Sequence, residues 1–392
     1  MKKTSFYIAI IFLMFSCMKE PEYHNLEMDI TFDFTENVLP EYRENAKVTL
    51  NNLQKSYSIT DYTDANGEVH FSGIEPGFYN IQLSHTFENE AGTDVNVNGL
   101  KSYELFESME DTVLCTVSIS NFLVIKEFYY SGCLTPAGNA YSADQFVEIY
   151  NNSPTVQYAD GMSIVEHESY GTAPNYWEWL KDTIVVKMIW TIPGEGTDYP
   201  IQPGESIVLA RDAFDHQSDP LGNPLSPVDL AHADFEFFVY TASGDDIDGA
   251  YSPNLIEDLF TFRGSDVSFH VKGGSAIALV QIPGNDSERK DYIANHLVLK
   301  ELVSTTRYYG KIPNEWVIDA VEVIFDEDYA AYKRFPLELD AGYTYNSAGS
   351  RSALSIRRKV KKIIDGRVIY QDTNNSSEDF IKGTEPKPWI YE

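Results

Sequence analysis

The chain has 392 residues, and its 29 Lys and Arg are outnumbered by 60 Asp and Glu, so the formal net charge is −31. A surface this acidic repels nucleic-acid phosphates and anionic lipid headgroups, so we expect no nucleic-acid partner and no purely electrostatic membrane binding. Apolar residues make up 43% of the chain, which predicts a packed core rather than disorder. The length corresponds to roughly two or three domains.

The first residues have the pattern of a secretory signal. Lys2 and Lys3 precede an apolar run over residues 6–15, which is too short to cross a bilayer core of about 20 residues. The run ends in the sequence MFSC, which resembles a lipoprotein box, although Phe15 is bulkier than usual. The resemblance implies that residues 1–16 are a lipoprotein signal peptide and that Cys17 carries the lipid. The alternative is a plain secretory signal with a chance cysteine.

Residues 17–25 form a short polar tether. Its start, CMKEPE, resembles the surface-export signals of Bacteroidota lipoproteins. This resemblance implies an outer-membrane lipoprotein that faces the cell exterior, with the membrane as a partner through the lipid on Cys17. The choice between the two leaflets stays open.

Residues 26–120 alternate apolar and polar side chains in short runs such as MDITFDF, AKVTLNN and YNIQLSH. Period-two alternation predicts half-buried strands. Asn66-Gly67 between two of these runs predicts a hairpin turn. A calcium loop is the alternative, but Val69 occupies the position where such a loop needs glycine.

The same stretch carries the first family resemblance. The pattern VTL…TDANGEVHFSGIEPGFYNIQL resembles a carboxypeptidase-regulatory-like, or prealbumin-like, β-sandwich. Such domains are usually stalks or spacers, and the resemblance implies no catalytic residue.

Residues 121–392 contain many short strand-like runs separated by turns rich in Pro, Gly and Asn. This pattern predicts a second, larger β-sandwich. Only residues 289–301 suggest a short helix, and residues 212–237 leave room for one or two helical turns. The predicted fold class is therefore all-β, with two sandwiches in tandem.

The second unit resembles a lamin-tail-like immunoglobulin sandwich. The resemblance rests on LVIKEFYYSG…DQFVEIYNNS…IQPGESIVLARDAFDH…DTNNSSEDF, in the long form found in a Bacteroidota lipoprotein family of uncharacterised function. A plain lamin tail is shorter, so insertions are expected around residues 154–200 and 212–272. Related domains serve as accessory or binding modules, and the resemblance carries no reaction.

Two acidic segments offer candidate metal ligands. Imidazoles and carboxylates in the first segment could bind a divalent metal, and the Gly-rich turn of the second could bind calcium. Neither spacing matches a strong signature, and solvated acids on turns are the alternative, so the expected cofactor is none or one divalent ion. The candidates are Asp212, Asp215, His216 and His232 in the first segment, and Asp245, Asp246 and Asp248 in the second.

Aromatic residues gather in the sequence YGTAPNYWEWL. Tyr176, Trp177 and Trp179 could stack on a sugar ring or fill a peptide pocket. The alternative is a small satellite core beneath a long loop.

Three further features have structural interpretations. Glu127 and Glu148 could be a glycosidase pair but have the positions of framework residues. The basic run at residues 357–362 predicts a solvated strand edge. Cys115 and Cys133 could pair in an oxidising compartment or stay as free thiols.

The sequence favours a non-enzymatic binding or accessory module on a surface lipoprotein. The family resemblance implies an envelope partner, such as a TonB-dependent receptor of the uptake machinery. One alternative is a glycan- or peptide-binding protein that uses the aromatic segment. The other is a metal-dependent hydrolase, although no nucleophile elbow, phosphate loop or HExxH motif occurs.

Overall fold

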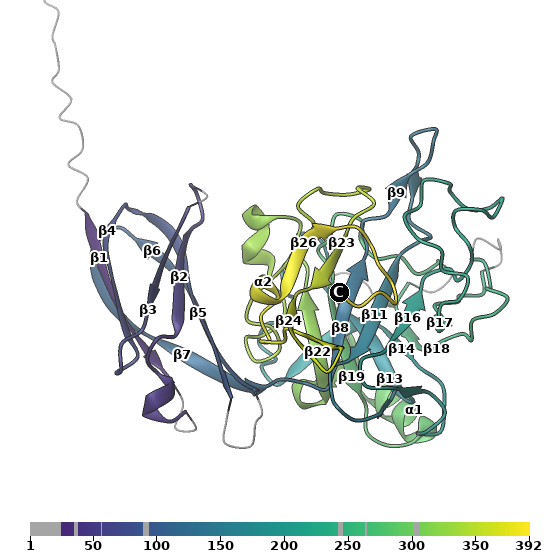
Figure 1. The fold of residues 1–392 in the computed structure, drawn as a ribbon, viewed down its shortest axis with the longest axis horizontal. Coiled ribbons are helices and arrows are strands. Elements are labelled where there is room, and N and C mark those ends of the chain that lie inside the picture. The colour runs from purple at the N-terminus through teal and green to yellow at the C-terminus, as the bar shows by residue number, and fades with distance from the viewer. Residues whose placement is uncertain are drawn as a thin grey trace, which may run out of the picture.

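The computed structural model describes residues 25–34, 38–55, 57–88, 94–241, 246–262, 265–300 and 306–392. These residues are almost entirely strands and turns, arranged in two lobes (Figure 1). The prediction of an all-β fold is confirmed. The predicted signal peptide and the predicted lipidation residue Cys17 lie outside the described residues. None of the described helices has the length and apolar character needed to cross a membrane.

The first lobe is a curled sheet with the strand order β3-β2-β5-β6-β7-β1-β4. Strand β1 buries every second residue, as the alternating sequence requires, and β1 pairs in parallel with β7. The end strands β3 and β4 also lie next to each other, so the sheet wraps around one apolar core. The strands are β1 (Leu26–Asp33), β2 (Lys47–Asn52), β3 (Ser58–Tyr62), β4 (Glu68–Ile74), β5 (Gly77–Glu88), β6 (Asp94–Leu105) and β7 (Met109–Ile119).

The turn at Asp64 is not the predicted hairpin. Asp64 Oδ1 accepts hydrogen bonds from the backbone N–H groups of Asn66 and Glu68, at 2.8 and 2.9 Å, and Gly67 adopts a φ of 82°. However, β3 pairs with β2 and β4 pairs with β1. The turn therefore connects the two edges of the curled sheet, which sequence alternation alone cannot distinguish from a hairpin.

The second lobe begins with β8 and contains two main sheets that pack face to face. One has the order β17-β16-β11-β8-β23-β26, and the other has the order β20-β21-β14-β13-β19-β22 with β18 beside β14. The first comprises β8 (Leu123–Tyr129), β11 (Phe146–Asn151), β16 (Ser206–Ala210), β17 (Phe235–Glu236), β23 (Ser355–Arg358) and β26 (Phe380–Thr384). The second comprises β13 (Met162–His167), β14 (Thr183–Thr191), β18 (Ile256–Phe260), β19 (Ala276–Gln281), β20 (Leu297–Leu299), β21 (Tyr308–Pro313) and β22 (Val317–Glu322).

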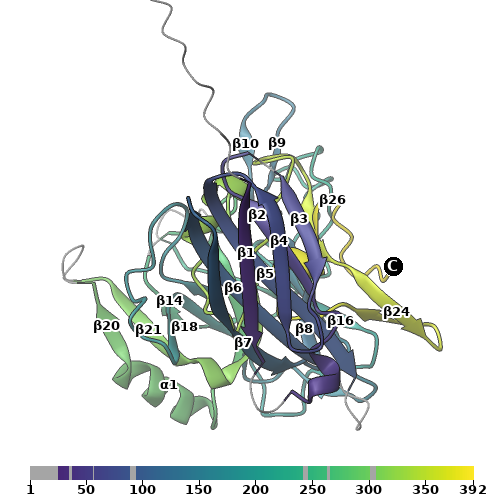
Figure 2. The ribbon, with the colours of Figure 1, turned by 90° about the vertical axis from the view of Figure 1, so that its left-hand side faces the viewer.

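Small elements decorate this sandwich, and Figure 2 shows the β24–β25 hairpin projecting from it. The two-stranded pairs are β9 (Cys133–Leu134) with β10 (Ala140–Tyr141), β12 (Gln157–Tyr158) with β15 (Pro200–Ile201), and β24 (Val360–Ile364) with β25 (Arg367–Tyr370). The helices are α1 (Asp286–Asn295) and α2 (Ser376–Asp379), with 3₁₀ turns at Pro40–Tyr42, Asn314–Trp316 and Glu327–Tyr332.

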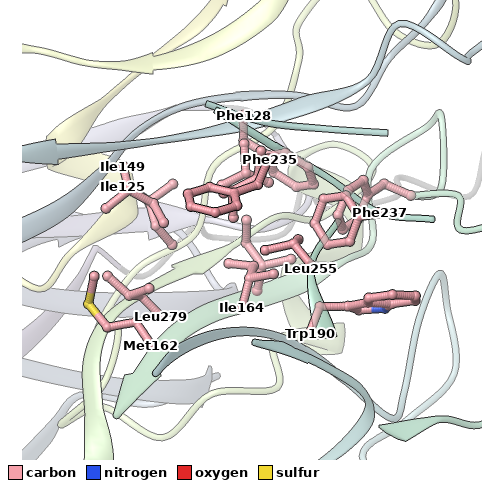
Figure 3. Close-up of a cluster of buried hydrophobic side chains, with 14 of the residues drawn as sticks. Ile125, Phe128, Ile149, Met162, Ile164, Trp190, Phe235, Phe237, Leu255 and Leu279 are labelled. Carbon is pink, nitrogen blue, oxygen red and sulfur yellow. The ribbon is translucent and has the colours of Figure 1, made fainter. Parts of the chain in front are cut away.

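The core of the second lobe lies between its two sheets (Figure 3). Phe128 and Ile149 come from one sheet, and Ile164 and Leu279 come from the other. Trp190 is fully buried, and its ring contacts those of Phe237 and Phe260. Burying each large side chain stabilises the fold by roughly 1.5–3 kcal/mol.

The helical predictions hold only in part. Helix α1 starts earlier than expected because Asn285 and Glu288 form a capping box. It ends at Asn295, and residues 297–299 form β20, which pairs with β21. Residues 212–237 contain turns, bends and β17 but no helix.

Residues 154–200, where an insertion is expected, contribute directly to the sandwich. This segment supplies β13 and β14, which are buried inner strands of the second sheet, so an insertion at this position stays a prediction. Cys115 and Cys133 are buried free thiols on β7 and β9.

The basic run at residues 357–362 is only half solvated, which corrects the prediction. Strand β24 is exposed, but Arg358 on β23 is fully buried. Its guanidinium lies 2.7 Å from Asp319, 3.3 Å from Asp372 and 3.2 Å from Asp379. These three carboxylates come from β22, from the turn after β25 and from α2, so one side chain ties three segments together.

The same turn fastens the second lobe to the first. The Asp372 carbonyl oxygen accepts hydrogen bonds from Asn96 Nδ2 at 3.1 Å and from Ser120 Oγ at 2.8 Å. The Thr373 carbonyl accepts one from Asn98 Nδ2 at 2.8 Å. Both asparagines are buried. The two lobes therefore meet through specific hydrogen bonds rather than only through the chain that connects them.

We predict that Arg358→Met destabilises the protein by about 3–5 kcal/mol, because it leaves buried aspartates without their counter-charge. Urea unfolding of the variant and the parent measures this difference. Lys362→Met, on the exposed hairpin, is the control and should change stability by less than about 0.5 kcal/mol. Equal stability of Arg358→Met and the parent would contradict the role given to this cluster.

Candidate ligand-binding site

The aromatic segment forms a loop between β13 and β14, here named the aromatic loop (residues 168–182). Trp179 is 61% exposed, while Tyr176 and Trp177 are half-buried. The Trp177 ring lies 4.9 Å from the Tyr176 ring and 5.3 Å from the Trp179 ring. The three rings therefore support one another and leave one indole open to solvent.

The start of the aromatic loop is held by a buried carboxylate. Glu168 accepts a hydrogen bond from Ser169 Oγ at 2.7 Å and forms an ion pair with Lys300 at 3.0 Å. The Lys300 ammonium also lies 4.8 Å from the centre of the Tyr176 ring, a cation–π contact. These contacts fix the Tyr176 ring against the body of the lobe.

The rest of the aromatic loop is fastened to a distant segment. Arg334 forms a fully buried ion pair with Glu322 of β22 at 2.8 Å, and its Nη2 donates to the Gly171 carbonyl at 2.6 Å. Asn175 Oδ1 accepts a hydrogen bond from the backbone N–H of Trp177 at 2.9 Å, which closes a tight turn. The aromatic loop is therefore organised before any ligand arrives, which lowers the entropic cost of binding.

A pocket of about 280 Å³ opens beside the aromatic loop. This volume is at the lower end for ligand sites, so the pocket suits a small group or one unit of a longer ligand. His167 at the end of β13, Trp177, Lys181, Lys333 and Arg334 all contribute to its lining.

His167 is an uncharged donor in this lining. The side chain is buried, and Nδ1 accepts a hydrogen bond from the Ser169 N–H at 3.1 Å. Burial, together with the nearby Arg334 charge, lowers the pKa of His167 to about 3. The ring is therefore neutral at pH 7 and carries its proton on Nε2.

Larger hollows lie elsewhere but offer weaker sites. An open groove of about 740 Å³ on the first lobe has carboxylates at half of its lining residues, including Asp29, Asp61 and Asp111, and none of its lining residues has a buried unpartnered polar atom. A hollow of about 390 Å³ lies beside Tyr170. Lys187 already sits 4.5 Å from the Tyr170 ring there and pairs with a buried glutamate.

The first predicted metal segment is not gathered into a metal centre. His216 is buried, and its Nε2 lies 3.0 Å from the Asp212 carbonyl while its Nδ1 lies 2.6 Å from Tyr141 Oη. Both ring nitrogens are therefore occupied. Asp215 closes a turn by accepting from the backbone N–H groups of residues 217 and 218, and His232 is exposed, with its ring near Tyr251.

The structure instead brings together residues from the two predicted segments. Asp212 and Asp246 are in contact, near Asp266. Asp248 is exposed and accepts a hydrogen bond from Asn254, and Asp245 lies outside the described residues. Burial and the Asp266 carboxylate raise the pKa of Asp212 to about 8, and burial raises that of Asp246 to about 6.

No set of three or more His, Cys, Asp or Glu in the described ranges is placed to hold a metal ion. A divalent metal at the predicted positions therefore stays a prediction.

Glu127 and Glu148 face each other on β8 and β11 and are fully buried. Lys126 lies 2.7 Å from Glu148 and 4.0 Å from Glu127. The backbone N–H groups of Lys387 and Trp389 donate to these carboxylates. The C-terminal segment therefore covers the pair, which acts as framework for the sheet.

Sequence reasoning found the aromatic residues of this site but missed its other walls. His167 looked like any histidine in a strand-like run. Lys333 and Arg334 lie far along the chain and reach the pocket only through the buried pair with Glu322. Among the residues of this site, only the aromatic cluster can be recognised from the local sequence.

Comparison with known proteins gives a family without an assigned activity. Residues 202–387 match the family described as "protein of unknown function (DUF4876)". The match includes Lys333 and Arg334 but not His167 or the aromatic loop. No curated protein matches.

A DUF4876 family protein from Bacteroides thetaiotaomicron, solved as a crystal structure, is 28% identical, with a TM-score of 0.60. The alignment covers 92% of this chain and 96% of that one. A streptococcal ancillary pilin is 13% identical, with a TM-score of 0.17, over 47% of this chain and 52% of that one. The lamin-tail-like and carboxypeptidase-regulatory-like resemblances are not confirmed by these matches.

We predict that Asp212→Asn reduces the loss of stability between pH 5 and 8. Asp212 keeps its proton up to about pH 8 when folded, whereas its ordinary pKa is 3.8. The folded protein therefore binds more protons than the unfolded chain in this window, so stability falls as the pH rises. Asparagine does not titrate, so the variant should lose at least about 1 kcal/mol less, since one pKa unit is worth about 1.4 kcal/mol.

Urea unfolding at several pH values measures this effect, with Asp248→Asn, at an exposed position of the second acidic segment, as the control. An Asp212→Asn protein whose stability depends on pH as steeply as the parent's would contradict the prediction.

Proposed function

We propose that the protein is a non-enzymatic, lipid-anchored binding module of the outer membrane that holds a glycan at the aromatic loop. The observation that carries this proposal is the placement of Trp179. Its indole is largely exposed, it is supported by the Trp177 ring, and the pocket lined by Trp177 lies beside it.

A glycan fits this combination better than a purely apolar ligand. The C–H face of a sugar ring packs on an indole face, while its hydroxyl groups need polar partners nearby. The pocket supplies such partners in His167, Lys181 and Lys333. A peptide is the alternative ligand, and the binding experiment below distinguishes the two.

We predict that Trp179→Ala weakens glycan binding at least about tenfold, which corresponds to about 1.4 kcal/mol. Affinity electrophoresis against a polysaccharide panel, followed by calorimetry on the hits, measures the change. Trp177→Ala should have the same effect, provided that its melting temperature shows an intact fold.

Tyr240→Ala is the matched control, because Tyr240 is 86% exposed and lies outside the pocket lining. If Trp179→Ala and Tyr240→Ala bind equally well, the aromatic loop is not the binding site. A panel in which only peptides bind would replace the glycan with the peptide alternative.

The proposed membrane location is based on the N-terminal segment up to and including the tether. The sequence MFSC and the polar segment after Cys17 have the pattern of a lipid-modified, exported chain. The module would then work beside an envelope partner, such as a TonB-dependent receptor, and deliver the bound glycan to it. A hydrolase has less support, because His216 and His232 do not form one site.

Cys17→Ser should abolish incorporation of labelled palmitate and release the protein from the outer-membrane fraction. The reason is that serine offers no thiol for the lipid, and the polypeptide then loses its anchor. Cell fractionation with metabolic labelling measures both effects, and Cys133→Ser, at a buried thiol, is the control.

Palmitate that still enters the Cys17→Ser chain would contradict the anchor. The solubilised outer membrane of the parent strain also tests the partner, since an envelope protein should co-purify with the tagged chain.

A further inference from the structure

The charge of the pocket lining is opposite to that of the protein. The chain as a whole has about twice as many acidic as basic residues. The charged residues of the lining are Lys181, Lys333, Arg334 and, on the acidic side, Glu178 alone. A locally positive pocket in an acidic protein attracts anions and holds them by charge-assisted hydrogen bonds.

Two of these cations form no ion pair with a described residue. Lys181 is exposed, and its ammonium forms no ion pair with any described residue. Lys333 donates to the Phe335 carbonyl and forms no ion pair within the described residues. Burial lowers the pKa of its ammonium, while the charges of Asp340, Glu322 and Glu338 raise it. By contrast, the charge of Arg334 is matched by Glu322.

The lining also holds N–H groups that lack an acceptor. Trp177 Nε1 and Arg334 Nε are buried and make no hydrogen bond. The Nε2 proton of His167, assigned above from its Nδ1 contact, has no acceptor among the described residues either. Buried donors without partners cost about 1–3 kcal/mol each, so a ligand rich in acceptors would recover part of that cost.

We propose that the ligand is an acidic glycan whose carboxylate or sulfate group enters this pocket while its neighbouring sugar ring stacks on Trp179. The proposal rests on the function proposed above and specifies its ligand class. An anionic group supplies several acceptor oxygens to the N–H groups and a counter-charge to Lys181 and Lys333, which neutral sugars and apolar ligands do not.

Matched pairs of oligosaccharides test this inference on the mature protein. Oligogalacturonate is compared with its methyl ester, and a 6-sulfated galactan oligosaccharide is compared with its desulfated form, by calorimetry. We expect the acidic member of at least one pair to bind ten or more times more tightly, and its affinity to fall as sodium chloride rises from 0.05 to 0.5 M. The two pairs distinguish a carboxylate from a sulfate.

Lys181→Gln combined with Lys333→Gln should remove at least about four-fifths of this preference, because glutamine keeps a hydrogen-bond donor but carries no charge, and it should therefore weaken binding of the acidic member far more than that of the neutral one. Lys362→Gln, on the exposed β24–β25 hairpin, is the matched control and should change neither value. The melting temperature confirms that each variant is folded.

Equal affinity for both members of each pair would overturn the inference but leave glycan binding in place. Binding of none of the four probes, or acidic binding that Trp179→Ala leaves intact, would overturn the ligand class and the proposed site together. Binding of polyglutamate without any acidic sugar would identify an acidic peptide instead.

Discussion

A charge carried into the apolar interior of this protein has to meet an opposite charge there, and the second lobe is built around that constraint. Arg358 is the main case: it lies between the sheets and contacts Asp319, Asp372 and Asp379. The turn that carries Asp372 also binds Ser120 at the end of the first lobe. One buried guanidinium thus orders β22, the turn after β25 and α2, and sets where the two lobes touch.

The same constraint shapes the ligand pocket. The buried pair between Arg334 and Glu322 holds the segment after β22 against the aromatic loop, and Arg334 donates to the Gly171 carbonyl. The rings of the aromatic loop also pack on one another. Charged and polar contacts fasten this ring cluster to the sandwich and leave Trp179 exposed beside a formed pocket. Binding would then cost little conformational entropy.

The sequence was informative where structure depends on local pattern. Alternating runs predicted an all-β fold, and the aromatic cluster identified one wall of the pocket. Prediction from the sequence failed where the structure depends on pairing between segments far apart in the chain. The Asp64 turn joins the two edges of the sheet and does not form a hairpin. The start of the basic run is buried because Arg358 meets three distant aspartates. The contribution of Lys333 to the pocket depends on tertiary structure in the same way, since no spacing in the sequence links it to Trp177.

The claim that matters most is that ligand enters the pocket at Trp177. The most direct test is the indole ¹H–¹⁵N signal of Trp177, assigned with Trp177→Phe and followed while oligogalacturonate or sulfated galactan is titrated into the labelled protein. We expect the Trp177 signal to shift in step with binding, while that of Trp190, buried in the core between the sheets, stays in place. A Trp177 signal that does not move while the glycan binds would contradict the account.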